Sequence, residues 1–455
     1  MYRTFLSLRL LLSRPINLIG ILALFIAVGA LIMILSIMTG FLDESRRGIR
    51  GSLSDVIIIP QHLGRSDRRE VPLDPQRLLK VVRADPRVEA ASAHLVWYGF
   101  VLGETGISRE YLKHSRRGED AIAQLAGIDV DEEFQATEFR QALEREPGDH
   151  GQPVVDSADP FALPPEYLPD GLPKASVVIG EQMMRRLYLR RGDVITIATA
   201  MPDADSVELG FTQNNRKFVI AGSFRTGEND MDLDRIYMDR RELSDLLGGT
   251  LEYSEVLVRL RDYDRDAGEV LEDLRYGLSA LGLIRGFAAD EVRTWEDFRG
   301  PLLGAIENER VLMGFMLSLV LVVAGFTVFA ILSMMVTEKT RDIGILTAVG
   351  ATPRGVMSLF LLIGFWDALL GATSGAVMGA WAAIEIDAIE QWLSRTIGIQ
   401  IFNRDVYLFD HIPSRVEPLA VVAIVAGAFV CTLFFAALPA WRAARTDPIA
   451  ALRYE

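Results

Sequence analysis

Cysteine is almost absent from this sequence of 455 residues, and the motifs that most often mark catalysis are missing. The single cysteine, Cys431, cannot form an internal disulfide, so no covalent framework is expected. The five histidines show neither HExxH nor paired-ligand spacing, and no Ser/His/Asp grouping stands out, so we assign no metal and no catalytic residue. No GxxxxGKS or GxxxxGKT segment is present to bind phosphate, which indicates that this chain does not hydrolyse ATP itself.

The sequence combines many apolar residues with an excess of acidic ones. Half of the residues are hydrophobic, the mean hydropathy is +0.23 and the net charge is -14. One water-soluble core does not explain that mixture, whereas a membrane protein with a large aqueous domain does. The acidic balance favours solubility of the aqueous part and gives no sign of a nucleic-acid-binding surface.

Four apolar segments are long enough to cross a bilayer, which takes about 20 residues of helix. The first could be mistaken for a signal peptide because Arg3, Arg9 and Arg14 precede it. Its apolar run exceeds the usual length of roughly 7 to 15 residues, and no cleavage site follows, so we interpret it as an uncleaved anchor. The four predicted transmembrane helices are residues 16–42, 311–336, 356–384 and 418–438.

Basic residues in the short connections set the predicted orientation, because cytoplasmic loops carry an excess of Lys and Arg. Such residues join the second helix to the third and follow the fourth, so both termini are expected in the cytoplasm. They are Lys339, Arg341, Arg354, Arg442, Arg445 and Arg453. The predicted cytoplasmic segments are 1–15, 337–355 and 439–455, and the predicted extracytoplasmic segments are a domain at 43–305 and a loop at 385–417.

The outer domain alternates between short apolar runs typical of strands and amphipathic stretches typical of helices, so we predict an α+β domain in two lobes. A proline- and aspartate-rich run at residues 146–174 has little apolar content and is the predicted hinge between the lobes. The expected strands are 55–60, 94–102, 193–200, 217–224 and 255–260, and the expected helices are 75–83, 181–189, 240–247 and 267–281.

A short helix is predicted in the stretch TEKTRDIGILTAVGATPRG, between the second and third apolar runs. Glu338 and Asp342 lie near its positive N-terminal end, where acidic groups are favourable. Ile343, Leu346 and Gly350 recur at helical spacing and are expected on one side of it.

A tight turn is expected to follow this helix. Gly350 suits the left-handed conformation that ends a helix, and Thr352 can cap the next one with Pro353 at its first position. The result is a rigid cytoplasmic elbow. It serves either to transmit a push from a soluble partner or only as a connector lying on lipid headgroups.

Two further features of the third span need an interpretation. Gly371, Gly375 and Gly379 form a stripe that permits close helix approach, and we interpret it as packing rather than gating. Asp367 places a carboxylate near the centre of the span, which costs about 2.5 to 3.5 kcal/mol on insertion scales. It should face protein or a watery cavity, in either a structural contact or a gating role.

Several stretches resemble one known family. VTEKTRDIGILTAVGATPRGVM is similar to the coupling helix of FtsX-like permeases, and the ending PAWRAARTDPIAALRYE is similar to that of the lipoprotein-releasing LolC and LolE type. Other stretches fall in the family's order and spacing, so the resemblance covers nearly the whole chain. They are SIMTGFLDE, VVIGEQMMRRLYLRRGDVITI, FRTGENDMDLDRIYM and TWEDFRGPLLGAIENERVLMGFMLSLVLVVAGFTVF.

The resemblance implies a permease subunit of an ABC transporter in the bacterial inner membrane. Such a subunit extracts lipoproteins from the outer leaflet and hands them to a periplasmic carrier of the LolA kind. ATP and Mg are used by a separate LolD-like ATPase, a second permease subunit completes a homo- or heterodimer, and no cofactor is bound by this chain. The residues expected to couple to the ATPase are Glu338, Lys339, Arg341, Asp342, Ile343, Leu346 and Gly350.

A substrate cavity is expected between the outer halves of the first two spans of paired subunits, as in the resembling family. Acyl chains need a wide and adaptable apolar surface, and Met adapts its shape best. Each of these residues could equally face lipid or a packing partner. The expected cavity residues are Met33, Ile37, Met38, Phe41, Met313, Met316 and Leu317.

One departure from the family concerns the carrier. In LolC-type subunits a proline-bounded hairpin grips the carrier, yet residues 201–217 hold proline only at Pro202. This segment is either a hook of different sequence or an ordinary surface hairpin.

Two rival functions remain open. A MacB-like efflux permease is disfavoured because no ATPase domain is fused to the chain. An FtsX-like mechanotransmitter, which activates a periplasmic cell-wall hydrolase, is disfavoured because its outer domain is smaller than the roughly 260-residue, two-lobed domain expected here.

Overall fold

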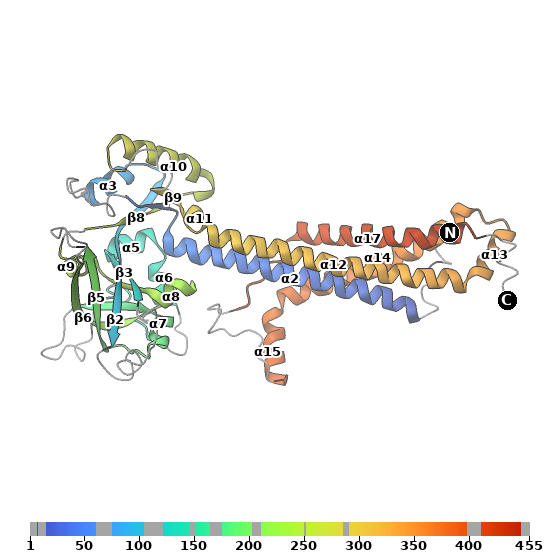
Figure 1. Ribbon diagram of the computed structural model, residues 1–455, viewed down its shortest axis with the longest axis horizontal. Coiled ribbons are helices and arrows are strands. Elements are labelled where there is room, and N and C mark those ends of the chain that lie inside the picture. The colour runs from blue at the N-terminus through green and yellow to red at the C-terminus, as the bar shows by residue number, and fades with distance from the viewer. Residues whose placement is uncertain are drawn as a thin grey trace. The chain divides into compact units, whose positions relative to one another are not determined.

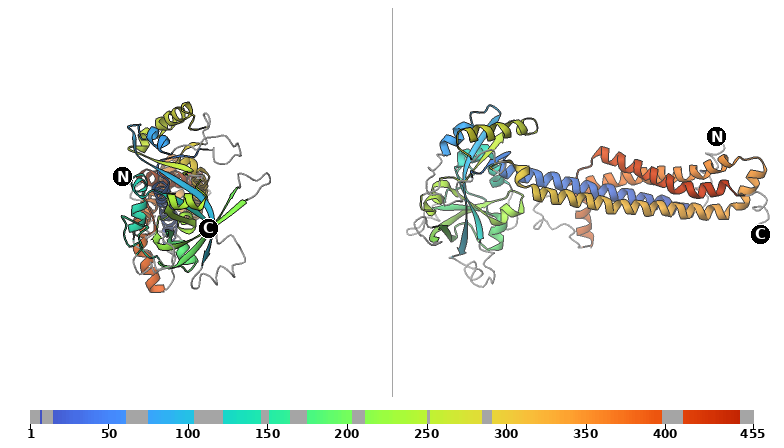
Figure 2. Two further views of the ribbon diagram at one scale, coloured as in Figure 1. Left: turned by 90° about the vertical axis from the view of Figure 1, so that its left-hand side faces the viewer. Right: turned by 45° about the horizontal axis from the view of Figure 1, so that its top comes forward.

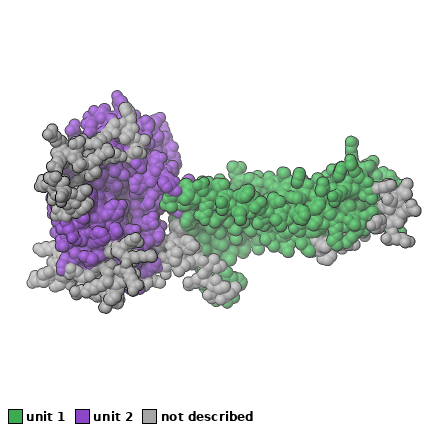
Figure 3. Space-filling model, in the orientation of Figure 1, with its two compact units in different colours: residues 1–44, 302–404, 409–455 green, residues 45–301, 405–408 purple. Residues whose placement is uncertain are grey.

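A computed structural model describes Ser7 and residues 15–60, 75–103, 122–145, 151–163, 175–202, 211–249, 252–284, 291–397 and 411–446. The chain divides into two compact units, which Figure 3 shows in different colours. We call residues 1–44, 302–404 and 409–455 the membrane unit, and residues 45–301 and 405–408 the aqueous unit.

The membrane unit contains four helices that are long and apolar enough to cross a bilayer, as predicted. A short helix, α13, connects the second to the third, and an amphipathic helix, α15, follows the third within the region predicted as a loop. The helices are α2 (Pro15–Leu53), α12 (Gly300–Glu338), α13 (Thr340–Ala348), α14 (Pro353–Ile384), α15 (Ile386–Ile397) and α17 (Pro418–Ala444).

The long helices pack side by side in alternating directions (Figures 1 and 2). A Cβ added to Gly20 of α2 would lie 3.6 Å from Val328 of α12, and one added to Gly314 would lie 3.7 Å from Leu35. The residue numbers fall along α12 as they rise along α2, so these two helices are antiparallel. Four consecutive spans of one chain require this alternation.

Two helices extend beyond the apolar runs that predicted them. The first continues past Leu42 to Leu53, and the second begins at Gly300 rather than at residue 311. Ile49 and Leu53, in the added part of α2, are 2% and 3% exposed in the aqueous unit. Hydropathy identifies the part of a helix that lies in the hydrocarbon core of the bilayer. It does not identify the residue at which the helical backbone hydrogen bonds end.

The aqueous unit is built on a nine-stranded mixed sheet in the order β3-β7-β4-β6-β5-β2-β8-β1-β9. Strand β2 also pairs with β3, so the strands from β3 to β2 in this order close into a ring. The strands are β1 (Val56–Ile58), β2 (Val88–Gly103), β3 (Ile122–Ile128), β4 (Ser176–Gly180), β5 (Val194–Pro202), β6 (Phe211–Phe224), β7 (Arg235–Asp239), β8 (Glu255–Leu260) and β9 (Val292–Thr294).

Two lobes share strand β2, which confirms the predicted two-lobed α+β domain. In the smaller lobe, α3 (Pro75–Val82) and α10 (Tyr263–Ala280) pack beside β1, β8 and β9 around one apolar core (Figure 1). The ring has its own cores. The other helices of the unit are α5 (Val130–Ala136), α6 (Phe139–Glu144), α7 (Glu181–Arg186), α8 (Asn229–Asp234), α9 (Arg240–Leu246) and α11 (Trp295–Phe298).

The predicted hinge at residues 146–174 is wrong. Its described part, 151–163, belongs to the larger lobe, where Val154, Phe161 and Leu163 pack against the core beside β6 and β7. The backbone N–H of Ser223 donates to Gln152 O at 2.7 Å, which ties the segment to β6. A run of low apolar content predicted a linker, but a few well-placed apolar side chains are enough to fix it to a sheet.

A buried ion pair lies where the two lobes meet. His94 of β2 and Glu133 of α5 are both 0% exposed, and His94 Nε2 contacts Glu133 Oε2. Thr137 Oγ1 donates to Glu133 at 2.8 Å and Ser92 Oγ donates at 3.1 Å. Burial alone would raise the pKa of Glu133, but the charge of His94 and these hydrogen bonds outweigh it and leave that pKa below its usual value.

Candidate functional site

The elbow between α12 and α14 begins where α12 ends at Glu338. Lys339 is the N-cap residue of α13, and its Nζ donates to Asp342 Oδ2 at 2.7 Å in the first helical turn. Thr340 Oγ1 donates back to Val336 O at 3.0 Å. The helix therefore spans Thr340–Ala348, and Glu338 belongs to α12.

The turn after α13 has the predicted geometry. Gly350 has a φ of +106°, the left-handed conformation that glycine adopts without strain. Ala351 N–H donates to Leu346 O at 2.9 Å, and the side chain of Thr352 accepts from Gly355 N–H at 3.2 Å. Pro353 follows as the first residue of α14. The change of direction is thus fixed by backbone and cap hydrogen bonds.

Ile343, one of the residues expected to couple to the ATPase, is not exposed. Ile343 is 1% exposed and belongs to the apolar core of the membrane unit, with Met335 of α12 and Val356 of α14. Leu346 is half-buried. At Ile343 this side of α13 packs onto the helix bundle.

The apolar residues that α13 presents to solvent are Ile345 and Val349, which are 47% and 84% exposed. They are four residues apart, so they lie on one face, and Arg341 and Asp342 continue that face toward the start of the helix. We call these four residues the outer face of α13. The sequence contains two apolar stripes in this helix, and nothing in its pattern says which of them packs inward.

The expected cavity residues lie on helices that run side by side. Gly314 of α12 faces Leu35 of α2, within a turn of several of them. Met316 is 58% exposed and Phe315 is 64% exposed, so α12 carries an uncovered apolar surface here. The half-buried members of the set are Met33, Ile37, Met38 and Phe41 on α2, and Met313 and Leu317 on α12.

The glycine stripe of α14 lies against α2. A Cβ added to Gly371 would be 2.7 Å from Leu24 Cβ, one on Gly375 would be 2.6 Å from Phe25 O, and one on Gly379 would be 2.5 Å from Gly29 O. Real Cβ atoms do not approach this closely, so only glycine permits the backbones to come together at this crossing. The positions rise together along both helices, which makes α2 and α14 parallel.

Asp367 also faces α2. Its side chain is 2% exposed, and a Cβ added to Gly20 would lie 3.9 Å from its Oδ2. Within the described part of the chain, Asp367 Oδ1 has no hydrogen-bond partner. The carboxylate is therefore enclosed by helices rather than exposed to lipid.

Several expected segments lie partly outside the described residues. Of the candidate hook at residues 201–217, the structure describes 201–202 and 211–217, which are the ends of β5 and β6. Of the C-terminal segment 439–455, it describes 439–446.

Comparison with known proteins assigns both halves of the chain. The family model of the MacB-like periplasmic core domain matches residues 18–275, and that of the FtsX-like permease C-terminal region matches residues 314–448. The lipoprotein-releasing system transmembrane protein LolC of Xylella fastidiosa (strain 9a5c) is 26% identical over 440 residues, covering 97% of this chain and 94% of that protein.

Two other relatives show how far each likeness extends. LolC of Neisseria meningitidis serogroup B is 26% identical over 450 residues, again covering 97% of this chain and 94% of that protein. The macrolide export ATP-binding/permease protein MacB of Syntrophobacter fumaroxidans is 30% identical over 135 residues, covering 30% of this chain and 16% of that protein. The likeness to LolC runs through both units, whereas the likeness to MacB is partial.

Proposed function

This chain belongs to the family of proteins with a MacB-like periplasmic core domain, and on that premise we propose that it is the inner-membrane permease subunit of a lipoprotein-releasing ABC transporter. The observation that carries the proposal is the likeness to LolC over 97% of the chain, through the aqueous domain as well as the spans. The orientation follows the basic residues of the short connections, with both termini in the cytoplasm.

ATP hydrolysis in this proposal belongs to a separate LolD-like ATPase, which uses ATP and Mg. The chain itself is a non-enzymatic subunit that binds no cofactor. The outer face of α13 is the surface offered to that ATPase, because it joins two exposed apolar side chains to charged ones. Ile345 and Val349 replace Ile343 and Leu346 as the side chains that would enter a groove of the partner.

The substrate path in this proposal runs between two permease subunits. The exposed surface of α12 around Phe315 and Met316 is a face that a single chain leaves open. A second copy or a related subunit, placed opposite α2 and α12, would turn that face into a cleft for acyl chains. A LolA-like periplasmic carrier would then receive the lipoprotein.

The coupling surface is tested with the double variant Ile345→Asp, Val349→Asp. Both side chains already contact water, so we expect an inserted, folded chain that loses ATPase co-purification and lipoprotein release by at least about tenfold. The matched control, Ile345→Leu with Val349→Leu, keeps the face apolar and should retain both. Normal ATPase binding and release by the aspartate variant would refute this surface.

The substrate path is tested with a photo-crosslinking residue at Met316, and at Val377 as a control. Val377 is 72% exposed on α14, so it is equally accessible but lies outside the expected cleft. We expect Met316 to capture lipoprotein without nucleotide and to lose it after ATP addition, while Val377 captures only phospholipid. Crosslinks to phospholipid alone at both positions, unchanged by ATP, would favour the mechanotransmitter function instead.

A further inference from the structure

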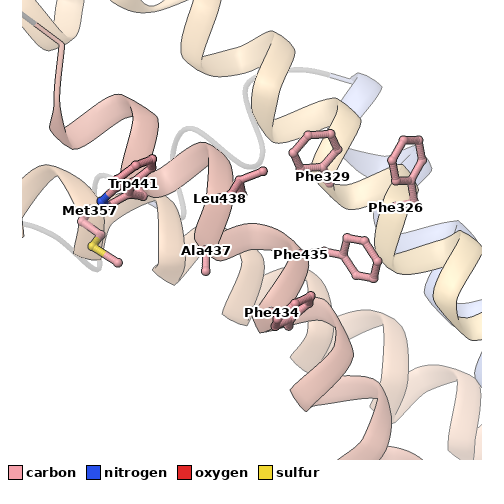
Figure 4. A pocket seen from close by; sticks show the side chains of 8 residues that line it. All are labelled: Phe326, Phe329, Met357, Phe434, Phe435, Ala437, Leu438 and Trp441. Atoms are coloured by element: carbon pink, nitrogen blue, oxygen red, sulfur yellow. The ribbon is translucent and has the colours of Figure 1, made fainter.

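An apolar groove opens between α12, α14 and α17, away from the expected cleft between α2 and α12. Its volume is about 520 Å³, and Figure 4 shows its lining side chains. Phe326 and Phe329 come from α12, Met357 comes from α14, and the others come from α17. The residues of α17 are Phe434, Phe435, Ala437, Leu438 and Trp441.

Aromatic side chains of α12 and α17 contact one another along the groove. The ring of Phe435 meets that of Phe326 edge-on, with 6.3 Å between centroids, and Phe434 meets Phe435 edge-on at 5.7 Å. Phe434 is nevertheless 75% exposed and Phe326 is 57% exposed. These rings therefore line the groove: they contact one another, and much of their surface remains exposed.

One face of α17 leads from the groove to a basic end. Phe434, Leu438, Trp441 and Arg445 recur at intervals of four, three and four residues, so they lie along a single stripe. The guanidinium of Arg445 lies 4.1 Å from the ring centroid of Trp441, a cation–π contact. The stripe thus begins with the apolar side chains of Phe434 and Leu438, continues with Trp441 and ends with the cationic Arg445.

Two further arginines gather at this end. Arg442 is exposed next to Trp441, and Arg354 is exposed one turn before Met357 on α14. Arg354, Arg442 and Arg445 form no ion pair with any residue that the structure describes. These three guanidinium groups are therefore available to an anion as far as the described residues go.

We propose that the groove binds an anionic phospholipid of the leaflet on the side of these arginines. An acyl chain would lie between Phe326 and Phe434, and the phosphate would contact Arg442 and Arg445. A phospholipid carries both parts in one molecule, in the order of the stripe, and a tryptophan at their junction is typical of the membrane interface. A spanning helix of another protein would fill the apolar part but bring no anion to the arginines.

The site does not depend on what the transporter carries. It requires only that the four long helices span a bilayer, so the lipid site and the proposed lipoprotein release can be tested independently of each other. Bound lipid would link α12, α14 and α17 at the end of the membrane unit where α13 lies (Figure 1).

The test uses Trp441 as a reporter of bound lipid. The full-length chain is reconstituted in phosphatidylcholine vesicles that contain a small, fixed fraction of brominated phosphatidylglycerol or, separately, of brominated phosphatidylcholine. Bromine quenches tryptophan on contact, and the difference between the unchanged chain and Trp441→Phe isolates the signal of Trp441. We expect brominated phosphatidylglycerol to be the better quencher, with a preference of about fivefold for each arginine that contacts the phosphate.

Two variants test the arginines and the apolar groove separately. Arg442→Gln with Arg445→Gln should bring the preference close to one while apolar contact remains. Ala437→Phe should fill the groove and remove quenching by both lipids while the arginines remain. Arg395→Gln, which removes an exposed arginine from α15, is the control and should leave the preference unchanged.

Size-exclusion chromatography of each variant checks that the chain is folded and monodisperse. Equal quenching by both lipids in the unchanged chain would mean ordinary contact with bulk lipid and would overturn the proposal. Quenching by neither lipid would mean that protein covers the groove, which would overturn it as well.

Discussion

Asp55, a buried carboxylate of the aqueous unit, contacts an arginine, whereas Asp367, a buried carboxylate of the membrane unit, forms no ion pair with any residue that the structure describes. Arg50 Nε donates to Asp55 at 2.6 Å, and Arg299 contacts Glu228 at 2.6 Å. The membrane unit gains close contacts from backbone meeting backbone at the glycines of α14. The surroundings explain the difference, because a charge buried in a water-facing domain needs a partner, while helices in lipid associate through small residues.

The largest loss of stability should come from placing a side chain at the glycine contact between α14 and α2. Gly375→Leu would place a Cβ 2.6 Å from Phe25 O, and a backbone atom cannot rotate away as a side chain can. We expect α2 and α14 to separate, at a cost of about 5 kcal/mol or more. Denaturant titration of the purified chain and its yield in membranes measure this loss.

Gly427→Ala is the matched control in the same unit. Nothing lies within 4 Å of a Cβ added to Gly427 in α17, so this change should be neutral or stabilise by up to about 1 kcal/mol. Equal stability of the Gly375 and Gly427 variants would show that the glycine stripe does not hold the bundle together.

The next effect should come from breaking a pair in the aqueous unit. Glu133→Gln removes the carboxylate at His94 Nε2 and leaves the longer contact of His94 Nδ1 with Glu255 Oε1 at 3.7 Å, and loss of one partner of a buried pair costs about 3 to 5 kcal/mol. Glu269→Gln is the control, since Glu269 is 82% exposed and its contact with Arg87 at 3.6 Å should contribute about 1 kcal/mol or less.

Chemical unfolding of the full chain, followed by far-ultraviolet circular dichroism, compares the two variants. A loss below about 1 kcal/mol for Glu133→Gln would mean that the buried pair contributes little to stability.

The elements that could be predicted most reliably from the sequence are those whose side chains all lie in a single environment, such as the lipid bilayer or a buried sheet. The four spans were recognised because each is apolar over a full membrane thickness, and the strand Glu255–Leu260 because its apolar run is short and bounded. Strand β2 was predicted only from His94, although it begins at Val88. Its first half, VEAASA, is rich in small residues with weak strand preference, and pairing with β8 fixes it.

Tertiary packing decided what the pattern left open at the candidate site. In α13 the apolar residues lie on several sides, so the burial of Ile343 and the exposure of Ile345 depend on where the neighbouring helices stand. The turn at Gly350 and Thr352 was predictable because its conformation depends on local chemistry alone. The stripe from Phe434 to Arg445 was not recognised because an apolar span gives no sign of which face lies beside a groove.

A smaller effect is expected from a buried carboxyl in the aqueous unit that has neutral partners only. Burial raises the pKa of Asp232 to about 6, although hydrogen bonds from Thr226 and Gly227 oppose the rise. Between about pH 4 and pH 6 the folded state therefore binds more protons than the unfolded state, and this group makes stability fall as pH rises. The full difference from the usual 3.8 corresponds to about 3 kcal/mol.

Asp232→Asn should remove this part of the pH dependence. Thermal unfolding of the full chain from pH 4 to pH 7 measures it, with Asp245→Asn, an exposed aspartate of α9, as the control. We expect the melting temperature to fall less steeply between pH 4 and pH 6 in the Asp232 variant only. Parallel curves for all three proteins would contradict the assignment.

The smallest change in stability should come from replacing Asp367, whose carboxylate has no ion-pair partner among the described residues. Asp367→Asn keeps the shape of a side chain whose Oδ1 accepts no hydrogen bond within the described residues, so no pairing is removed. We expect a change in stability of less than about 1 kcal/mol and unchanged lipoprotein release. Asp367→Leu is the companion variant, because it also removes the polar group from between α2 and α14. If either variant folds normally but stops release, Asp367 acts in gating, and the membrane unit then uses its unpaired carboxylate for function where the aqueous unit uses paired ones for stability.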